Sequence, residues 1–155
     1  MIRKDLIFLG VDLESKDSLF EYISKKLYEK NLITDVNEYV KVLKIREAEY
    51  PTSIGYEIAI PHGKSDCVVE PFIVYLKLNN PILWDQESNS NVNSIFMIGV
   101  NNDNGSNIHL LYLSNIARAL MDDEFREQLR ISETLEDTFN LLNEINHKLE
   151  EEKVV

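Results

Sequence analysis

The first third of the chain shows one strand-like apolar run followed by two helical patterns. Residues 6–13 read LIFLGVDL and predict a short strand. A helix is expected from Ser15 or Asp17, both suitable N-terminal caps, to about Lys30, with Asn31 as a stop signal. A second helix is expected over residues 35–48. The inward positions of these two helices are Leu19, Phe20, Ile23 and Leu27, and then Val36, Tyr39, Val40 and Leu43.

The middle of the chain has the shorter apolar runs of β-strands. The stretch before Val100 is almost entirely apolar, which indicates a central strand covered on both faces. Residues 79–91 are rich in Asn and Ser and are expected to form a loop with an edge turn, and residues 101–107 (NNDNGSN) a second loop. The expected strands are residues 57–60, 71–78 and 92–100.

Helical spacing returns in the last third. We expect a helix from Ser106 or Asn107, a short helix over residues 122–129, and a final helix capped by Ser132 whose end, residues 150–155, frays. Since strands and helices are mixed throughout, the predicted fold class is α/β, with a mixed central β-sheet flanked by helices. The predicted buried positions are Leu113, Ile116, Ala117 and Leu120, and then Leu135, Phe139, Leu142, Ile145 and Leu149.

Composition adds limits to this architecture. The chain has 155 residues, the size of one ordinary domain, so residues 1–155 are predicted to form a single domain. The formal net charge is −11, and there is no excess of Lys and Arg to displace the counterions of phosphates. Nucleic acid and anionic lipid are therefore disfavoured as partners, and a basic protein partner is favoured.

Cysteine usage and hydropathy point to a compartment. The single cysteine, Cys67, excludes a disulfide or a Cys-based metal site within the chain and is read as a small core or edge residue. No apolar run approaches the roughly 18 residues that a membrane span needs, and no cleavable leader is apparent. We therefore expect a cytoplasmic protein that does not insert into a membrane.

The segment AIPHGKSD, residues 59–66, carries the first candidate for chemistry. Pro61 restricts the backbone, and Gly63 allows a sharp turn or a close approach of another chain, so His62 is presented at the end of a strand. Taken by itself, this histidine is also compatible with a loop residue that has no role.

His109 and Arg46 are the next candidates. His109 lies at the start of a helix on its inward face, where unpaired N–H groups favour an anion, although a histidine bonded to backbone fits the position equally. Arg46 continues the apolar stripe of its helix, being seven residues after Tyr39. It either pairs with the helix dipole and an acid or holds an anion with its planar guanidinium.

These residues favour a nucleophilic histidine over other chemistries. Asp66 or Asp85 can be added to the histidines as metal ligands, but the spacing asks for neither, so we expect no metal and no cofactor. Motifs of nucleotide-binding loops and of serine hydrolases are absent from the sequence. Neutral imidazole attacks phosphorus well, and a guanidinium, a second imidazole and helix N–H groups suit the incoming charge.

Four segments together resemble a known family. The sequence RE at residues 46–47, PTSIGYEIAIPHGK at 51–64, PILW at 81–84 and HLLYLSNIARAL at 109–120 are similar to the EIIA domain of the bacterial phosphoenolpyruvate-dependent sugar phosphotransferase system, fructose/mannitol type. The resemblance covers almost the whole chain. It implies a fold like that of the phosphotransferase and anion-transport proteins, and a phosphotransferase activity with a phosphohistidine intermediate.

The resemblance also implies roles and partners. The donor is the carrier HPr, and the acceptor is a cysteine of EIIB, which serves the membrane component EIIC; the sugar stays open among galactitol, fructose, mannitol and others. His62 is implied as the phosphoryl acceptor, His109 and Arg46 as its neighbours, and Thr52, Ser53 and Gly63 as the phosphate loop, with Ser53 replacing the family's usual glycine. A regulatory protein switched by the phosphohistidine is the main alternative. The cytoplasmic domain of an anion transporter and a metal-dependent hydrolase are weaker ones.

Overall fold

A six-stranded β-sheet forms the centre of the molecule in the computed structural model, which describes residues 1–103 and 105–154. The strand order is β1-β5-β6-β3-β2, and β4 also pairs with β6. β5 runs antiparallel to β6 and β2 antiparallel to β3, whereas β1 is parallel to β5, and β3 and β4 are parallel to β6, so the predicted mixed sheet is confirmed. The strands are β1 (Ile2–Val11), β2 (Ser53–Gly55), β3 (Ile58–Ala59), β4 (His62–Lys64), β5 (Phe72–Asp85) and β6 (Ser90–Val100).

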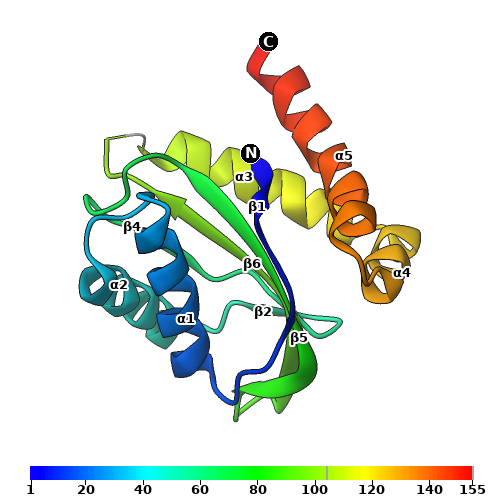
Figure 1. Cartoon of the computed structure of the whole chain (residues 1–155), viewed down its shortest axis with the longest axis horizontal. Coiled ribbons are helices and arrows are strands. Elements are labelled where there is room, and N and C mark those ends of the chain that lie inside the picture. Colours follow the sequence, from blue (N-terminus) through cyan, green and yellow to red (C-terminus); the bar gives the residue numbers. More distant parts are fainter. Residues whose placement is uncertain (104, 155) are drawn as a thin grey trace.

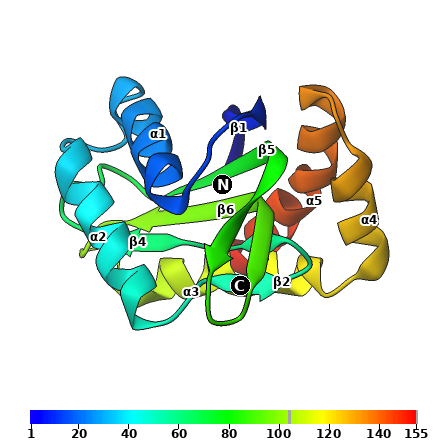
Figure 2. The same cartoon turned by 90° about the horizontal axis from the view of Figure 1, so that it is seen from below.

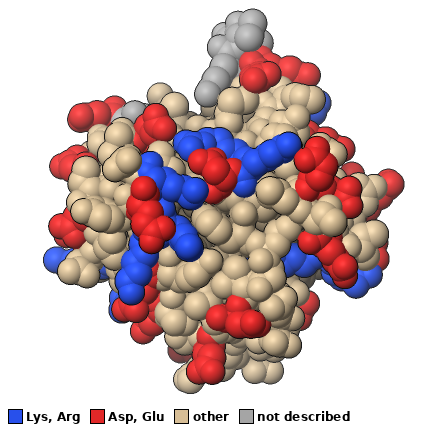
Figure 3. All heavy atoms as spheres, viewed as in Figure 1, with Lys and Arg blue, Asp and Glu red and all other residues tan. Residues whose placement is uncertain are grey.

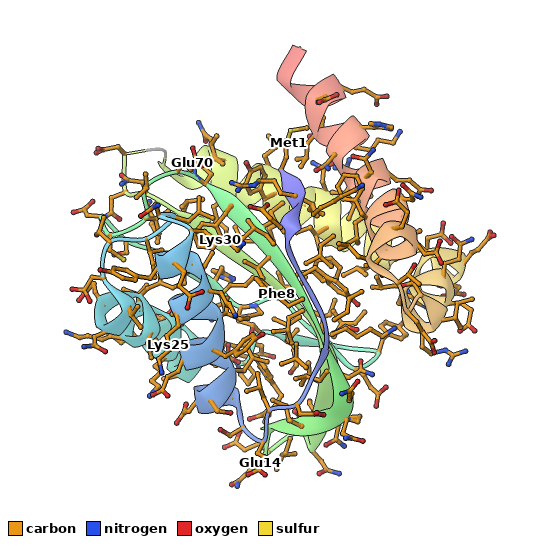
Figure 4. The ribbon with its side chains drawn as sticks, in the orientation of Figure 1. Met1, Phe8, Glu14, Lys25, Lys30 and Glu70 are labelled. Carbon is orange, nitrogen blue, oxygen red and sulfur yellow. The ribbon has the colours of Figure 1, made fainter. Side chains whose placement is uncertain are left out.

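Helices cover both faces of this sheet. α1 (Lys16–Glu29) and α2 (Val36–Glu49) pack on one face, and α3 (Gly105–Leu120), α4 (Asp123–Ile131) and α5 (Leu135–Val154) on the other (Figures 1 and 2). Neighbouring residues of one strand therefore enter different cores: Val74 faces α1 and α2, while Tyr75 faces the other layer. This explains why β5 and β6 read as almost continuous apolar runs, and side chains fill the space on both sides of the sheet (Figure 4).

The first two helices begin where the sequence predicts. The side chain of Ser15 accepts a hydrogen bond from the amide of Ser18, and that of Asp35 accepts one from the amide of Glu38 at 3.0 Å. After α1 the chain turns at Asn31, whose φ of 61° lies in the left-handed region that suits Asn. These capping signals are local, which is why they could be read from the sequence.

The loop predicted over residues 79–91 is wrong. β5 continues to Asp85 and pairs again with β6 from Ile82 onward, so that only residues 86–89 form the turn of a hairpin. Pro81 lies within the register shift that separates the two paired stretches, where its missing N–H breaks no ladder bond. Beyond it the alternation of a strand resumes, with Ile82 and Trp84 buried and Leu83 exposed. The first strand is also longer than predicted, since it begins at Ile2.

The last helix is capped differently from the prediction. Ser132 ends α4, and the side chain of Thr134 accepts the hydrogen bond from the amide of Asp137 at 3.1 Å that caps α5. Leu135 then points outward with 44% of its surface exposed, in contrast to the prediction. α5 extends to Val154, so the structure has a helix over most of residues 150–155, where fraying was predicted. Residue 155 lies outside the described residues.

The buried face of α3 is rotated slightly from the predicted one. Ile116 and Leu120 are buried as expected. Tyr112 and Asn115 are also buried, whereas Leu113 and Ala117, which were expected to be buried, are only half-buried. The helix starts at Gly105, one or two residues before the predicted start at Ser106 or Asn107. The loop expected at 101–107 includes residue 104, which lies outside the described residues.

The outer edge of β1 is covered partly by a side chain of α5. The amide group of Asn146 accepts from the backbone N–H of Ile2 and donates to its carbonyl, both at 2.8 Å, as a neighbouring strand would. On the face shown in Figure 3, Lys and Arg gather around β1 and α1, interspersed with acids. Arg3, for example, pairs with Asp5 and Glu70. Among the described residues, no helix has both the length and the apolar character needed to cross a bilayer.

Candidate functional site

His62 lies at the first position of the short strand β4, beside the carboxyl end of β6. Its register partner is Ile98, and the amide of Ile98 donates to the carbonyl of Pro61 at 3.0 Å. α3 begins shortly after β6 ends. The histidine therefore lies where a central strand ends near a helix N-terminus, which is where sheets of α/β proteins commonly place sites.

Gly63 serves close packing and not the sharp turn that was expected. It lies in extended strand β4, and its φ is not in the left-handed region. A Cβ atom at this position would lie 2.9 Å from a ring carbon of Tyr39 on α2. The absence of a side chain lets β4 approach α2, which also carries Arg46, so glycine brings the two elements of the site together.

The hydrogen bonds of His62 determine which nitrogen holds the proton. Nδ1 lies 3.0 Å from the carbonyl oxygen of Ile60, which only accepts, so Nδ1 is the donor. Nε2 accepts from Nε of Arg46 at 3.0 Å, and a guanidinium only donates. The imidazole is therefore held as the tautomer whose lone pair is on Nε2.

His109 lies against His62. The centroids of the two rings are 4.5 Å apart and the planes are inclined at 42°. His109 is on the early part of α3, as the sequence predicted. Its Nε2 atom is buried and has no hydrogen-bond partner among the described residues, which is uncommon for a buried polar atom and typical of a position that receives a ligand.

Burial keeps both imidazoles neutral. It lowers the pKa of His62, and the nearby charge of Arg46 lowers that pKa further. Burial likewise lowers the pKa of His109, and the nearby charges of Arg46 and Lys64, and of His62 whenever that ring is protonated, act in the same direction. Since a histidine titrates ordinarily near about 6.5, both rings are neutral at neutral pH, and His62 has a lone pair available for attack.

Arg46 is held between the helix end and the histidine. It lies in the last turn of α2, where its Nη1 donates to the carbonyl of Tyr50 at 2.9 Å. The same guanidinium bonds His62, so the structure supports a place in the site over a purely local role at the helix terminus. A planar guanidinium in this position can hold an anion delivered to Nε2.

A buried carboxylate beneath the site was missed by the sequence reasoning. Glu47 is 7% exposed and accepts from the amide of Thr52 at 2.9 Å and from its hydroxyl at 2.6 Å. Nε1 of Trp84 donates to it at 2.7 Å, and Nζ of Lys16 lies 3.6 Å away. We call Lys16, Glu47, Thr52 and Trp84 the Glu47 cluster.

This cluster changes the interpretation of the loop before His62. Both donors of Thr52 are directed to Glu47, so Thr52 anchors the loop from below, while Ser53 begins β2 and is only half-buried. The signal for Glu47 was its spacing, four residues after Leu43 and seven after Val40, which places an acid on the inward face of α2. Trp84 is buried and donates a hydrogen bond to Glu47.

The remaining candidates lie apart from this chemistry. Cys67 is buried, and burial raises the pKa of its thiol, which disfavours the reactive thiolate. Asp66 accepts a hydrogen bond from Asn102, and Asp85 accepts from Ser88 in the hairpin. In the part of the chain that the structure describes, no three His, Cys, Asp or Glu side chains are grouped so as to hold a metal ion.

Comparison with known proteins gives the family. The profile described as "Phosphoenolpyruvate-dependent sugar phosphotransferase system, EIIA 2" matches residues 1–145. The chain belongs to this family, as the resemblance of its motifs predicted, and the family agrees with a fold that places a histidine at the end of β6.

Individual relatives are named either as components of sugar phosphotransferase systems or as nitrogen regulatory proteins. The chain is 28% identical over 138 residues to the PTS system fructose-like EIIA component of Escherichia coli, covering 89% of this chain and 92% of that protein. It is 33% identical over 132 residues to the PTS system fructose-specific EIIABC component of Mycoplasma pneumoniae, covering 85% of this chain but only 19% of that protein. The crystal structure of nitrogen regulatory protein IIA-Ntr from Neisseria meningitidis superposes with a TM-score of 0.82 at 26% identity, covering 91% and 95% of the two chains.

Proposed function

We propose that this protein is a phosphocarrier of the sugar phosphotransferase system, with His62 as the phosphoryl acceptor, HPr as the donor and a cysteine of EIIB as the recipient. The observation that carries the proposal is the state of His62. Its neutral ring is fixed by Ile60 with the lone pair on Nε2, next to a guanidinium and a second neutral imidazole. A reducing, cytoplasmic setting is part of the proposal.

On this chain, the transfer chemistry involves only the residues of the site. The lone pair of Nε2 attacks the phosphorus of a phosphohistidine on the donor; an N–P bond forms at His62, and the donor's N–P bond breaks with its electron pair returning to the donor imidazole. Nδ1 keeps its proton on the carbonyl of Ile60 throughout. In the second step a thiolate attacks the phosphorus, and the pair of the N–P bond returns to Nε2.

Arg46 has to move before the first step, because its Nε donates to the lone pair that attacks. Once that bond is released, the guanidinium can pair with the phosphoryl oxygens and offset their charge. The unpartnered Nε2 of His109 supports a second contact, since its ring can present a nitrogen to the same group. Gly63 and the loop at Thr52 and Ser53 support the site by holding His62 in place.

The experiment incubates the purified chain with phosphoenolpyruvate, Enzyme I and HPr and measures intact mass and acid lability. We expect the mass to rise by that of one phosphoryl group, with loss in acid and retention in base, and no gain for His62→Ala. His109→Ala is expected to accept phosphate but to retain or transfer it poorly. Acid-labile phosphate that persists on folded His62→Ala would disprove the assignment.

A regulatory role is the second candidate. The similarity to the nitrogen regulatory protein from Neisseria meningitidis favours it, because that chain matches this one over almost its full length. The two roles separate after phosphorylation: a carrier loses its phosphoryl group to an EIIB within the assay, while a regulator keeps it and changes its affinity for another protein. Single-turnover transfer to EIIB proteins of fructose, mannitol and galactitol type is the deciding measurement.

A further inference from the structure

We propose that Glu47 is a positioning residue for His62, which acts through Thr52 and Ile60 to keep the proton on Nδ1 and the lone pair on Nε2. Among the described residues, no hydrogen bond joins Glu47 directly to the imidazole. Its link to the ring passes through Thr52 and Ile60. The consequence for phosphoryl transfer rests on the proposed function, whereas the consequence for the tautomer does not.

Four hydrogen bonds form the link. The carboxylate of Glu47 accepts from the amide of Thr52 at 2.9 Å and from its hydroxyl at 2.6 Å. The carbonyl of Thr52 accepts from the amide of Ile60 at 2.9 Å. The carbonyl of Ile60 accepts from Nδ1 of His62 at 3.0 Å. In both Thr52 and Ile60, the N–H that donates and the C=O that accepts belong to different peptide groups. The link therefore fixes the positions of these groups and does not pass polarisation from one hydrogen bond to the next.

The starting point of the link is rigid. Glu47, Thr52 and Trp84 are exposed by only 7%, 6% and 2%, and they come from α2, the loop after it and β5. Lys16 at the start of α1 adds a cation 3.6 Å from the carboxylate and donates to the backbone carbonyl of Trp84 at 3.0 Å. A buried carboxylate is stable only while such donors surround it, which ties the loop to three elements at once.

Such a support is needed because the neutral imidazole in water favours the opposite tautomer, protonated on Nε2. The carbonyl of Ile60 has to stay in line with Nδ1 to reverse that preference, together with the guanidinium of Arg46 that donates to Nε2. Residues 51–60 contain only the short strands β2 and β3 and three consecutive positive φ angles, at Gly55, Tyr56 and Glu57. The anchor at Thr52 therefore limits how far this loop, and with it Ile60, can shift.

The test measures the tautomer of His62 directly, by NMR of the imidazole nitrogens in the unphosphorylated chain. Thr52→Val removes one donor and Trp84→Phe another, while Glu47→Gln keeps the shape of the side chain. We expect the wild-type chain to show the proton on Nδ1, and each variant to show a mixture with the proton on Nε2. Thr52→Ser, which retains the hydroxyl, is expected to restore the wild-type spectrum.

The transfer rate gives a second readout. Loss of one hydrogen bond of this kind is expected to slow phosphoryl acceptance by about five- to tenfold. It is also expected to place part of the phosphoryl group on Nδ1, which phosphorus NMR of the intact chain distinguishes from Nε2. Lys77→Met is the matched control, since it removes a half-buried charge that donates to carbonyls at the end of α4, on the other side of the sheet.

The outcomes are separable. If folded Thr52→Val and Trp84→Phe keep the wild-type tautomer and acceptance rate, Glu47 has no positioning role and the inference is wrong. If the tautomer shifts in these variants but the wild-type chain accepts no phosphate from HPr, the inference stands and the proposed function fails. Should Glu47→Gln not fold, the Thr52 and Trp84 variants still decide the question, because each leaves the carboxylate in place.

Discussion

Two charged side chains, Glu47 and Lys77, are compensated in similar ways on opposite sides of the sheet. The carboxylate of Glu47 is surrounded by donors from Thr52 and Trp84 and by the nearby ammonium of Lys16. Nζ of Lys77 donates to three carbonyls where α4 ends, those of Leu129, Arg130 and Ser132, at 3.1, 2.7 and 2.8 Å. Burial lowers the pKa of Lys77, because the charge loses part of its hydration there.

The difference is in what the partners are connected to. Lys77 joins β5 to the end of α4 and to Ser132, which in turn accepts a hydrogen bond from Thr138 on α5. Glu47 joins three elements to the loop that ends at His62. The same compensation of a buried charge therefore serves stability in one region and the orientation of a nucleophile in the other. Substitutions in the two regions should therefore affect stability and phosphoryl transfer differently.

Arg46→Gln is expected to have the largest effect on transfer. The substitution removes a cation that can pair with the phosphoryl group, and a hydrogen bond to a charged group contributes about 1.5–3 kcal/mol, so acceptance should slow by about ten- to a hundredfold. Removal of the charge also raises the pKa of His62 toward its ordinary value. Rapid-quench transfer from phosphorylated HPr gives the rate, and a wild-type rate would exclude an electrostatic role for Arg46.

Gly99→Ala tests whether instability alone moves the tautomer. A Cβ atom at this position would lie 2.1 Å from the ring of Phe72, which is fully buried, so the β5–β6 contact must shift. We expect the free energy of unfolding in urea to fall by about 1–3 kcal/mol. The hydrogen bonds of the Glu47 cluster do not involve Gly99, although Gly99 is the register partner of Gly63 in β4, so His62 should keep its proton on Nδ1 in the folded protein. A changed tautomer here would show that packing at the β4–β6 contact, and not Glu47 alone, positions His62.

Lys77→Met should cost stability without affecting transfer. Three carbonyls lose a charged donor, and we expect unfolding to become easier by about 1–2 kcal/mol, a fall in Tm of about 2–8 °C for a chain of this size. Phosphoryl acceptance should stay within about twofold of the wild-type rate. Calorimetry and the transfer assay measure the two quantities on the same sample; a slow but fully folded variant would contradict the separation of the two regions.

The smallest expected effect is a dependence of stability on pH that comes from the two histidines of the site. His62 and His109 have lowered pKa values, so the folded state binds protons less readily than the unfolded chain. Their contribution to stability is complete above about pH 6.5 and is lost as the pH falls through their folded-state pKa values. Urea unfolding between about pH 7.5 and about pH 5 should show a shallower decline for His109→Gln than for wild type. Lys77→Met should keep the full decline, and equal slopes in all three proteins would refute this assignment.

Local chemistry made much of the fold readable from the sequence. Ser15 and Asp35 begin helices because their side chains accept from amides three residues later, and Asn31 tolerates the backbone angle at which α1 ends. His109 was placed on the inner face of its helix by spacing. The contact between His109 and His62 was implied only by the family, because 47 residues separate them in the chain.

The errors arose where distant contacts override local signals. The Asn and Pro residues at 79–81 have the composition of a loop, yet pairing with β6 resumes at Ile82 because a bulge absorbs the irregularity. Ser132 is as good a cap as Thr134 by composition, and only the geometry of the α4–α5 connection selects between them. Glu47 was overlooked because an acid on an apolar stripe gives no indication that Trp84 and Thr52 will supply its donors.

The bond between Trp84 and Glu47 also gives the protein an optical signal. Trp84 is the only tryptophan in the sequence, so the indole fluorescence of the whole chain comes from the Glu47 cluster. Indole emission depends on the polarity around the ring and on the hydrogen bond of its N–H group. Excitation selective for indole therefore makes the unlabelled protein report, in real time, on the surroundings of Trp84, which include its bond to Glu47 and the ring of Phe20.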